Sequence, residues 1–345
     1  MGQTNNVLHH YLDHPETFAD LFNGVLFGGK MIVDAKELTE ASEQYIESDD
    51  GILAKSNMEK GKYISRNRDL RKYLNGRGIL RILAVENQNQ VDYSMPFRCM
   101  EYDTLEYRRQ LENLHRKNEK TDSYATAAER LCRVRKDDRL HPVYTLCLYH
   151  GEQPWDGPRS MKDMMEFGEK DPWESYFADY PMLLYCINEE NDFSAFHTEL
   201  RELLQAMQYR KDKKKLKRLF EENEAYRHLS EETVEAIAVV MDAPELWRKR
   251  DMYRSVKDDE KAGYNMCQGL REWIEDERNA GRAEGKAEGK AEDILDLLAE
   301  KGEVPQMLRE YIINQDDANV LKKWLLTAAK ADTIQEFETR INLPG

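Results

Sequence analysis

Apolar residues recur every three or four positions over Pro15–Phe27, and this spacing predicts an amphipathic helix. The pair Gly28-Gly29 follows directly, and glycine readily ends a helix because it tolerates a left-handed backbone. The same spacing predicts a long helix over Tyr93–Lys117, with Pro96 in its first turn, and a helix over Phe193–Tyr209. Further helical segments are predicted over residues 36–47, 118–140, 266–300 and 318–330.

A different pattern lies between these helices. Ile79–Val85 is an almost unbroken apolar run, and the turn sequence Asn75-Gly76-Arg77-Gly78 precedes it, so a β-hairpin is predicted. With the hairpin axis between Gly76 and Arg77, Asp69 lies opposite Ala84 and Glu86 is the next residue on the same face. Diagonal neighbours of this kind are roughly 7–8 Å apart.

The remaining strands complete the expected fold class. Pro142–His150 reads as a half-buried strand, the Gly- and Pro-rich residues 151–159 as a loop, and Phe177–Ile187 as a further strand interrupted at Pro181. A mixed sheet flanked by helices, an α+β fold, is therefore expected over residues 1–210. The basic run Arg210–Lys215 marks the predicted boundary, and residues 211–345 form a helical C-terminal region.

The composition of the chain argues against a membrane protein, a secreted protein and a zinc-binding protein. In 345 residues no apolar run approaches the length of about 18 that a membrane helix needs, and the N-terminus lacks a signal-peptide pattern. The five cysteines have no close pairing, which argues against a zinc site or a disulfide framework. A cytoplasmic protein with no membrane partner is expected.

The net charge of −15 is unevenly spread along the chain. Residues 51–150 hold 20 Lys and Arg against 13 Asp and Glu, whereas residues 1–50 hold 2 against 10. A basic surface around an acidic pocket suits phosphodiester chemistry, because cations bind the backbone and carboxylates bind a metal ion. The cationic side chains near the predicted hairpin and on the following helix are Arg66, Arg68, Arg71, Lys72, Arg108 and Arg109. The contrasting interpretation is that these six side chains are ordinary solvated charges with no role in binding.

Acidic and amide side chains meet on the predicted hairpin. Asp69 and Glu86 lie close enough to share one hard cation, and Gln88 has the same strand parity as Glu86 and points the same way. These three residues form a predicted metal and water site. A Glu at the end of an apolar strand is otherwise simply the residue at which the strand meets solvent.

An ordered set of motifs carries a family resemblance. Asp69-Leu70, the apolar strand, Glu86-x-Gln88, Met95-Pro96-Phe97-Arg98 and Tyr102 occur in that order. This order resembles the PD-(D/E)XK nuclease superfamily, and in particular the recombination-promoting nucleases, also called putative transposases. Phe18–Phe22 resembles the opening helix of that family, and Pro142–Leu146 with Trp155 resembles its next strand and loop. The resemblance covers roughly residues 7–205.

The resemblance implies a restriction-endonuclease-like core and a DNA endonuclease that depends on Mg²⁺ or Mn²⁺. Asp69 and Glu86 would be the metal ligands, for one ion or two, and Gln88 would stand where the superfamily usually has lysine. An acidic residue of the first helix often joins such sites, and here Glu16 and Asp20 are both candidates. Arg98, Tyr102 and Arg109 either contact the site or the nucleic acid, or are structural residues at the rim of the fold. His150, at the end of a strand, is either a base or a structural histidine.

Two other classes of function compete with this one. Because Gln88 is neutral and the chain is acidic, a nuclease-derived DNA-binding or scaffold protein without catalytic activity is the alternative. A third class is a helical oligomerisation protein. Its support is a four-residue repeat over residues 281–292, GRAEGKAEGKAE, whose Gly and Ala face allows close helix packing. This face suits either a homo-oligomer through the C-terminal helices or a movable arm that contacts DNA. The contrasting interpretation is a flexible charged connector.

Overall fold

The computed structural model describes residues 3–40, 44–46, 65–67, 70–76, 78–190, 192–255 and 263–341. The chain divides into two compact units, residues 1–266 and 267–345. The sequence predicts a boundary at residue 210, but α7 (Glu231–Val240) packs on α1 (Gln3–Asp13) and on α5 (Leu200–Tyr209) in the first unit. One link is the 3.0 Å hydrogen bond between the hydroxyls of Tyr11 and Thr233.

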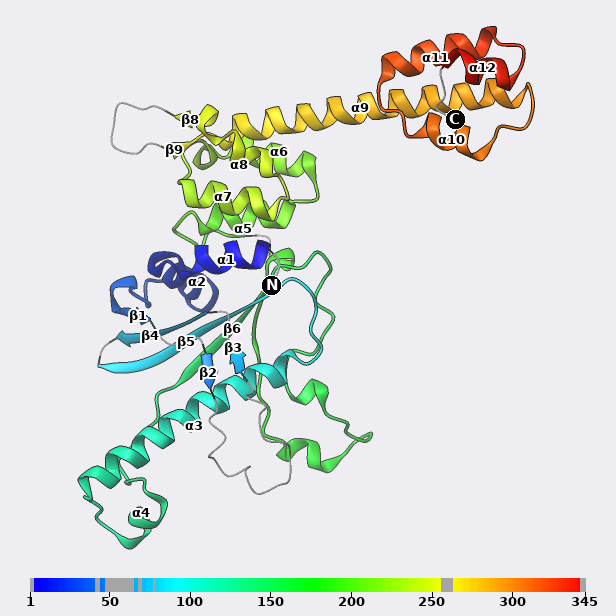
Figure 1. The fold of residues 1–345 in the computed structure, drawn as a ribbon. Helices are drawn as coiled ribbons and strands as arrows, with labels where there is room; N and C mark the ends of the chain where they lie inside the picture. The colour runs from blue at the N-terminus through cyan, green and yellow to red at the C-terminus, as the bar shows by residue number, and fades with distance from the viewer. Residues whose placement is uncertain are drawn as a thin grey trace. The chain divides into compact units, whose positions relative to one another are not determined.

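The first unit is an α+β structure, as predicted (Figure 1). Its other helices are α2 (Pro15–Phe27), α3 (Met95–Thr121), α4 (Ala127–Cys132), α6 (Lys213–Glu222) and α8 (Pro244–Arg248). Its strands are β1 (Leu38–Glu40), β2 (Gln44–Ile46), β3 (Ser65–Asn67), β4 (Leu70–Gly76), β5 (Ile79–Gln88), β6 (Val143–Tyr149), β7 (Leu183–Cys186), β8 (Arg254–Ser255) and β9 (Gly263–Tyr264).

A five-stranded mixed sheet organises this unit, in the order β1-β4-β5-β6-β7. The pairs β1–β4 and β4–β5 are antiparallel, whereas β5–β6 and β6–β7 are parallel. Figure 1 shows α1 and α2 on one side of the sheet and α3 on the other. Because both faces are covered, β5 is buried continuously from Ile82 to Asn87.

The hairpin is confirmed, but its predicted register is wrong by two residues. Leu70 pairs with Val85, and Ala84 pairs with Arg71 rather than with Asp69. The strands remain paired as far as Gly76 and Ile79, so only two residues connect them. Gly78 supplies the positive φ, 72°, that such a short connection needs. A shift of two residues leaves every side chain on its predicted face.

The predicted helix over residues 36–47 is also wrong. Leu38–Glu40 forms the edge strand β1, and its residue Leu38 pairs with Leu74 of β4. The outer backbone groups of β4 need hydrogen-bond partners, and this requirement outweighs the helical propensity of a short acidic segment. By contrast, α2 and α11 have the predicted bounds, and Gly28 ends α2 with a φ of 59°.

Buried ion pairs fasten the sheet to its covering helices. The Arg71 guanidinium contacts the Glu106 carboxylate of α3 at 2.8 Å, and both side chains are almost fully buried. On the opposite face, the ammonium group of Lys72 binds Asp13 at 2.7 Å and Glu40 at 2.6 Å. These two cations therefore do not belong to the predicted basic surface.

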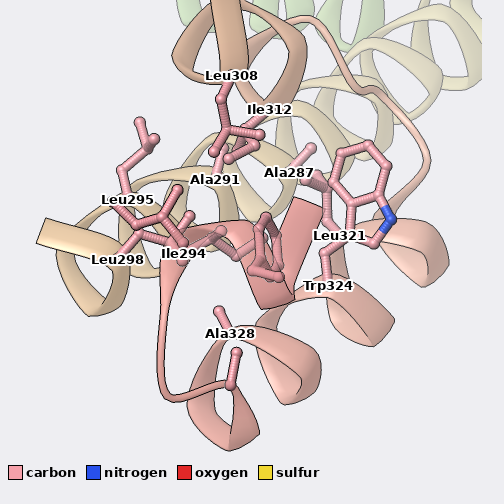
Figure 2. Close-up of a cluster of buried hydrophobic side chains, with 13 residues drawn as sticks. Ala287, Ala291, Ile294, Leu295, Leu298, Leu308, Ile312, Leu321, Trp324 and Ala328 are labelled. Atoms are coloured by element: carbon pink, nitrogen blue, oxygen red, sulfur yellow. The ribbon is translucent and has the colours of Figure 1, made fainter. Parts of the chain in front are cut away.

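The second unit is helical, which agrees with the predicted C-terminal region. It contains α9 (Met266–Ala299, which begins at the boundary), α10 (Gln306–Ile313), α11 (Ala318–Lys330) and α12 (Ile334–Ile341). Side chains of all four helices converge in one apolar core (Figure 2). The Lys290 ammonium donates to the Ala318 carbonyl at 2.6 Å, which ties α9 to the start of α11.

The repeat on α9 has two different stripes. Ala287 and Ala291 are buried in the core of the second unit. At Gly281, Gly285 and Gly289, an added Cβ would meet no described atom within 4 Å. The glycine stripe therefore lies open along the described part of the chain.

The first prediction concerns the buried pair. Glu106→Ala leaves the buried Arg71 guanidinium without its carboxylate, so we expect the free energy of unfolding of the first unit to fall by about 3–5 kcal/mol. Urea denaturation followed by circular dichroism measures this change. Glu112→Ala is the matched control on the same helix, because its pairs with Arg108 and Arg116 are exposed and should contribute about 1 kcal/mol or less. Equal effects of the two substitutions would contradict the assignment.

The second prediction concerns the glycine stripe. Alanine has the higher helix propensity and meets no obstacle at residue 285, so Gly285→Ala should stabilise the second unit by about 1 kcal/mol. Thermal unfolding monitored by circular dichroism provides the measurement. Destabilisation, or a loss of self-association in sedimentation, would instead reveal a helix packed closely against the glycines.

Candidate functional site

Glu86 lies at the carboxyl end of β5, in the middle of the sheet, and is 1% exposed. It pairs with Cys147 in β6, and its side chain faces α3, where it contacts Arg98. Gln88 is two residues further along the same strand and is partly buried. Because strand side chains alternate, Gln88 shares the face of Glu86. The structure therefore brings these two predicted site residues together.

Arg98 joins this group from the first turns of α3. One of its terminal nitrogens lies 2.6 Å from Asp92 Oδ2, and the other lies 3.4 Å from Glu86 Oε2. Burial alone would lower the pKa of Arg98, but hydrogen bonds with Asp92 and Tyr102 and the nearby Glu86 charge raise it overall. Arg98 is therefore a permanent cation beside the buried carboxylate. Its side chain remains 32% exposed.

Sequence reasoning missed Asp92, which holds Arg98 in place. The Asp92 carboxylate also accepts hydrogen bonds from the Ser94 backbone N–H at 2.8 Å and from the Ser94 hydroxyl at 2.6 Å. Burial opposes ionisation, but the bonds from Ser94 and Arg98 lower the pKa of Asp92 overall. The sequence contains a pattern that could have indicated this role. An Asp two residues before a Ser, just ahead of Met95-Pro96, is typical of the turn that begins a helix.

Asp69, the second predicted metal ligand, lies outside the described residues. Its neighbour in the chain, Leu70, pairs with Val85, which directly precedes Glu86. Arg66 lies in β3 and Arg68 lies outside the described residues, so neither side chain contributes to this description.

Three thiols, those of Cys99, Cys147 and Cys186, belong to one small buried cluster formed by β6, β7 and the start of α3. Burial, with the neighbouring Cys99 and Glu86, raises the pKa of Cys147 well above its usual value. The thiol is therefore protonated at neutral pH, and it is a packing group rather than a nucleophile.

The other predicted nucleic-acid contacts have internal partners. Tyr102 is 7% exposed and hydrogen-bonds to Arg98. Arg109 binds the Glu106 carboxylate at 2.6 Å and the Tyr73 hydroxyl at 2.9 Å, although 41% of its side chain is exposed. Of these three residues, Arg98 and Arg109 present substantial surface to solvent.

The two acidic residues of α2 differ in their surroundings. The Asp20 carboxylate is buried and accepts hydrogen bonds from the backbone N–H groups of His197 and Thr198 and from the Thr198 hydroxyl, at 2.7–2.9 Å. These bonds hold the segment before α5, which explains why that helix begins at Leu200 and not at Phe193. Glu16 is exposed.

His150 follows β6 and is 3% exposed. Its backbone N–H donates to the Gln88 carbonyl at 2.9 Å, so the ends of β5 and β6 lie side by side. Burial, together with the Arg210 charge, lowers the pKa of His150 to about 4. The imidazole is therefore neutral at pH 7.

Oxygen donors dominate the chemistry at the Glu86 end of the sheet. The Glu86 carboxylate and the Gln88 amide oxygen are hard ligands of the kind that Mg²⁺ and Mn²⁺ prefer. Across the described ranges, no group of three or more His, Cys, Asp or Glu side chains is arranged to hold a metal ion.

Comparison with known proteins leaves the site without a relative. No family model, no curated protein and no solved structure matches the chain. Within the described ranges, every helix falls short of the length or apolar character that crossing a lipid bilayer demands.

The third prediction follows from the buried imidazole. His150 has a pKa of about 4 in the folded protein and an ordinary value of 6.5, so below pH 6.5 the unfolded chain binds a proton that the folded chain does not. Stability is therefore lost as the pH falls from 6.5 towards 4, by about 3 kcal/mol for this group. Urea denaturation at pH 7.5 and at pH 4.5 should show a smaller acid loss for His150→Gln than for the unsubstituted chain. Equal losses would contradict the burial argument.

Proposed function

We propose that the first unit is a divalent-metal-dependent endonuclease that hydrolyses DNA phosphodiester bonds. The observation that carries the proposal is the buried carboxylate of Glu86 at the end of a central strand, with a guanidinium beside it. A buried charge is costly to hold, so a protein that retains one beside exposed surface commonly uses it.

The order of elements supports a restriction-endonuclease-like core. An antiparallel hairpin is followed by α3, which bears Arg98 and Tyr102, and then by the parallel strand β6. The motifs that resemble the nuclease family lie on these elements in the same order. Glu86-x-Gln88 lies at the end of β5, and α3 begins a few residues later.

Glu86 and Asp69 would hold the metal ion, with Gln88 beside them. When bound, such an ion lowers the pKa of a water molecule and neutralises charge on the attacked phosphate. Gln88 orients the water or the phosphate through its amide, which carries no charge. Arg98 balances the charge of Glu86 and binds a non-bridging phosphate oxygen through its exposed portion. Asp92 fixes the position of that guanidinium.

The DNA backbone would approach the exposed parts of Arg98 and Arg109. Contacts of this kind position a duplex without reading its sequence. Arg71 and Lys72 take no part in this contact because their charges are buried in ion pairs.

The fourth prediction tests catalysis. With Mg²⁺ or Mn²⁺ the full chain should nick supercoiled plasmid, and a chelator should abolish nicking. Glu86→Gln and Asp69→Asn keep the side-chain shapes but remove the charges that bind the metal, so the nicking rate should fall by about two orders of magnitude or more. Glu112→Gln removes an exposed carboxylate of α3 and is the matched control, with an unchanged rate.

Circular dichroism of each variant separates loss of activity from loss of folding. Equal nicking by Glu86→Gln, Asp69→Asn and the unsubstituted chain would show that the site lies elsewhere. If the folded, unsubstituted chain fails to cut but binds DNA in a salt-dependent manner, the protein is instead a nuclease-derived binding protein. The Arg98–Glu86 contact favours that second function, since it balances the carboxylate without a metal ion.

A further inference from the structure

A cavity of 610 Å³ opens beyond the carboxyl ends of β5 and β6. Its wall is made by the residues that follow β5 and β6 and by the ends of α5 and α7, all within the first unit. In open α/β sheets, the crevice outside the carboxyl ends of parallel strands is a common place for ligands, and the parallel pair β5–β6 ends in the same way here. The volume falls within the range of about 300–1,000 Å³ that is usual for small-molecule sites.

His150 lines this cavity and carries a polar atom without a hydrogen-bond partner in the described part of the chain. Its Nε2 atom is fully buried and has no hydrogen-bond partner among the residues that the structure describes. A buried polar atom without a partner destabilises the fold. A ligand group that reaches Nε2 would supply the missing hydrogen bond.

Arg210 adds a cation to the wall of this cavity. Its guanidinium donates to the carbonyls of His150 at 2.7 Å and Met207 at 3.1 Å, and it forms no ion pair with a described carboxylate. Burial lowers the pKa of Arg210, although the Glu152 charge opposes this effect. Lys211, the next residue, adds a second cation to the wall. Its ammonium nitrogen forms an ion pair with the Glu152 carboxylate at 3.2 Å. A partly buried cation of this kind attracts an anion.

The rest of the wall shows that the ligand is larger than a bare anion. Met207, Val239 and Val240 offer an apolar surface that suits a planar ring. Asn89 and Gln153 offer amides that can pair with the edge of a base. The carboxylates of Glu152 and Asp242 suit the hydroxyls of a sugar, as acidic residues do in other nucleotide sites.

We propose that this cavity binds a nucleotide, with the phosphate on Arg210 and Lys211 and the base between the apolar wall and His150. The ligand is either a free mononucleotide or one nucleotide of a strand, since both present the same base, sugar and phosphate. The site is separate from Glu86 and requires no metal ion, so it does not rest on the endonuclease activity.

The fifth prediction is measured by isothermal titration calorimetry of the full chain in a chelator. The probes are the four common nucleoside monophosphates, inorganic phosphate, unphosphorylated adenosine and a short single-stranded oligonucleotide. At least one monophosphate, or the oligonucleotide, should bind more tightly than inorganic phosphate by about tenfold or more. Binding of the monophosphate identifies a free ligand, and binding of the oligonucleotide alone identifies a strand.

Two substitutions place the ligand in the cavity. Arg210→Gln should weaken binding by about tenfold or more, and His150→Gln should weaken it while circular dichroism shows an intact fold. Lys217→Gln, an exposed cation on α6 outside the cavity, is the control with unchanged affinity. The proposal is overturned by no binding of any nucleotide probe, by binding of inorganic phosphate as tight as that of a nucleotide, or by folded variants that bind as the unsubstituted chain does.

Discussion

The Glu106 carboxylate holds α3 against the sheet, and the geometry of the candidate site depends on this contact. Glu106 accepts from Arg71 of β4 and from Arg109 of its own helix, so one buried anion lies between two guanidinium groups. A second buried acid, Asp103, binds the Thr145 hydroxyl of β6 at 2.6 Å and the Tyr180 hydroxyl at 2.5 Å. These contacts fix the rotation of α3 about its axis, and that rotation aims Arg98 at Glu86.

The parallel pairing of β5 with β6 brings the polar strand ends together. Glu86 and Gln88 end β5 on the face of α3, whereas His150 continues β6 towards α5 and α7. Two distinct polar environments therefore share one edge of the sheet. One is a carboxylate with a cation and oxygen donors, and the other is a neutral imidazole with a partly buried guanidinium. For the first we propose a metal ion and a phosphodiester as ligands, and for the second a nucleotide.

Charge along the sequence was a poor guide to charge on the surface. The segment 51–150 is basic in composition, yet Arg71 and Lys72 are among the most buried side chains of the first unit. Each is satisfied by an acid from a distant part of the chain, because a buried cation requires a partner. A count of residues cannot distinguish a cation inside an ion pair from one that faces a ligand.

The sequence by itself determined the elements whose signals are local. Apolar spacing located α2 and α11, Gly28 located the end of α2, and the Gly-containing turn located the hairpin of β4 and β5. The approximate position of α3 and the strand β6 followed from the same kind of pattern. In each case the residues that define the element lie within a few positions of one another.

Tertiary structure decided what depends on distant partners. β1 is a strand because the edge of β4 needs hydrogen bonds, and α5 begins late because Asp20, about 180 positions earlier, binds the backbone before it. The hairpin register, the burial of Arg71 with Glu106, and the meeting of Arg98 with Glu86 are of the same kind. Glu86 and Gln88 were identified from the sequence because they end an apolar strand. Asp92, Arg210 and the cavity at His150 were not, because only the folded chain brings their partners within reach.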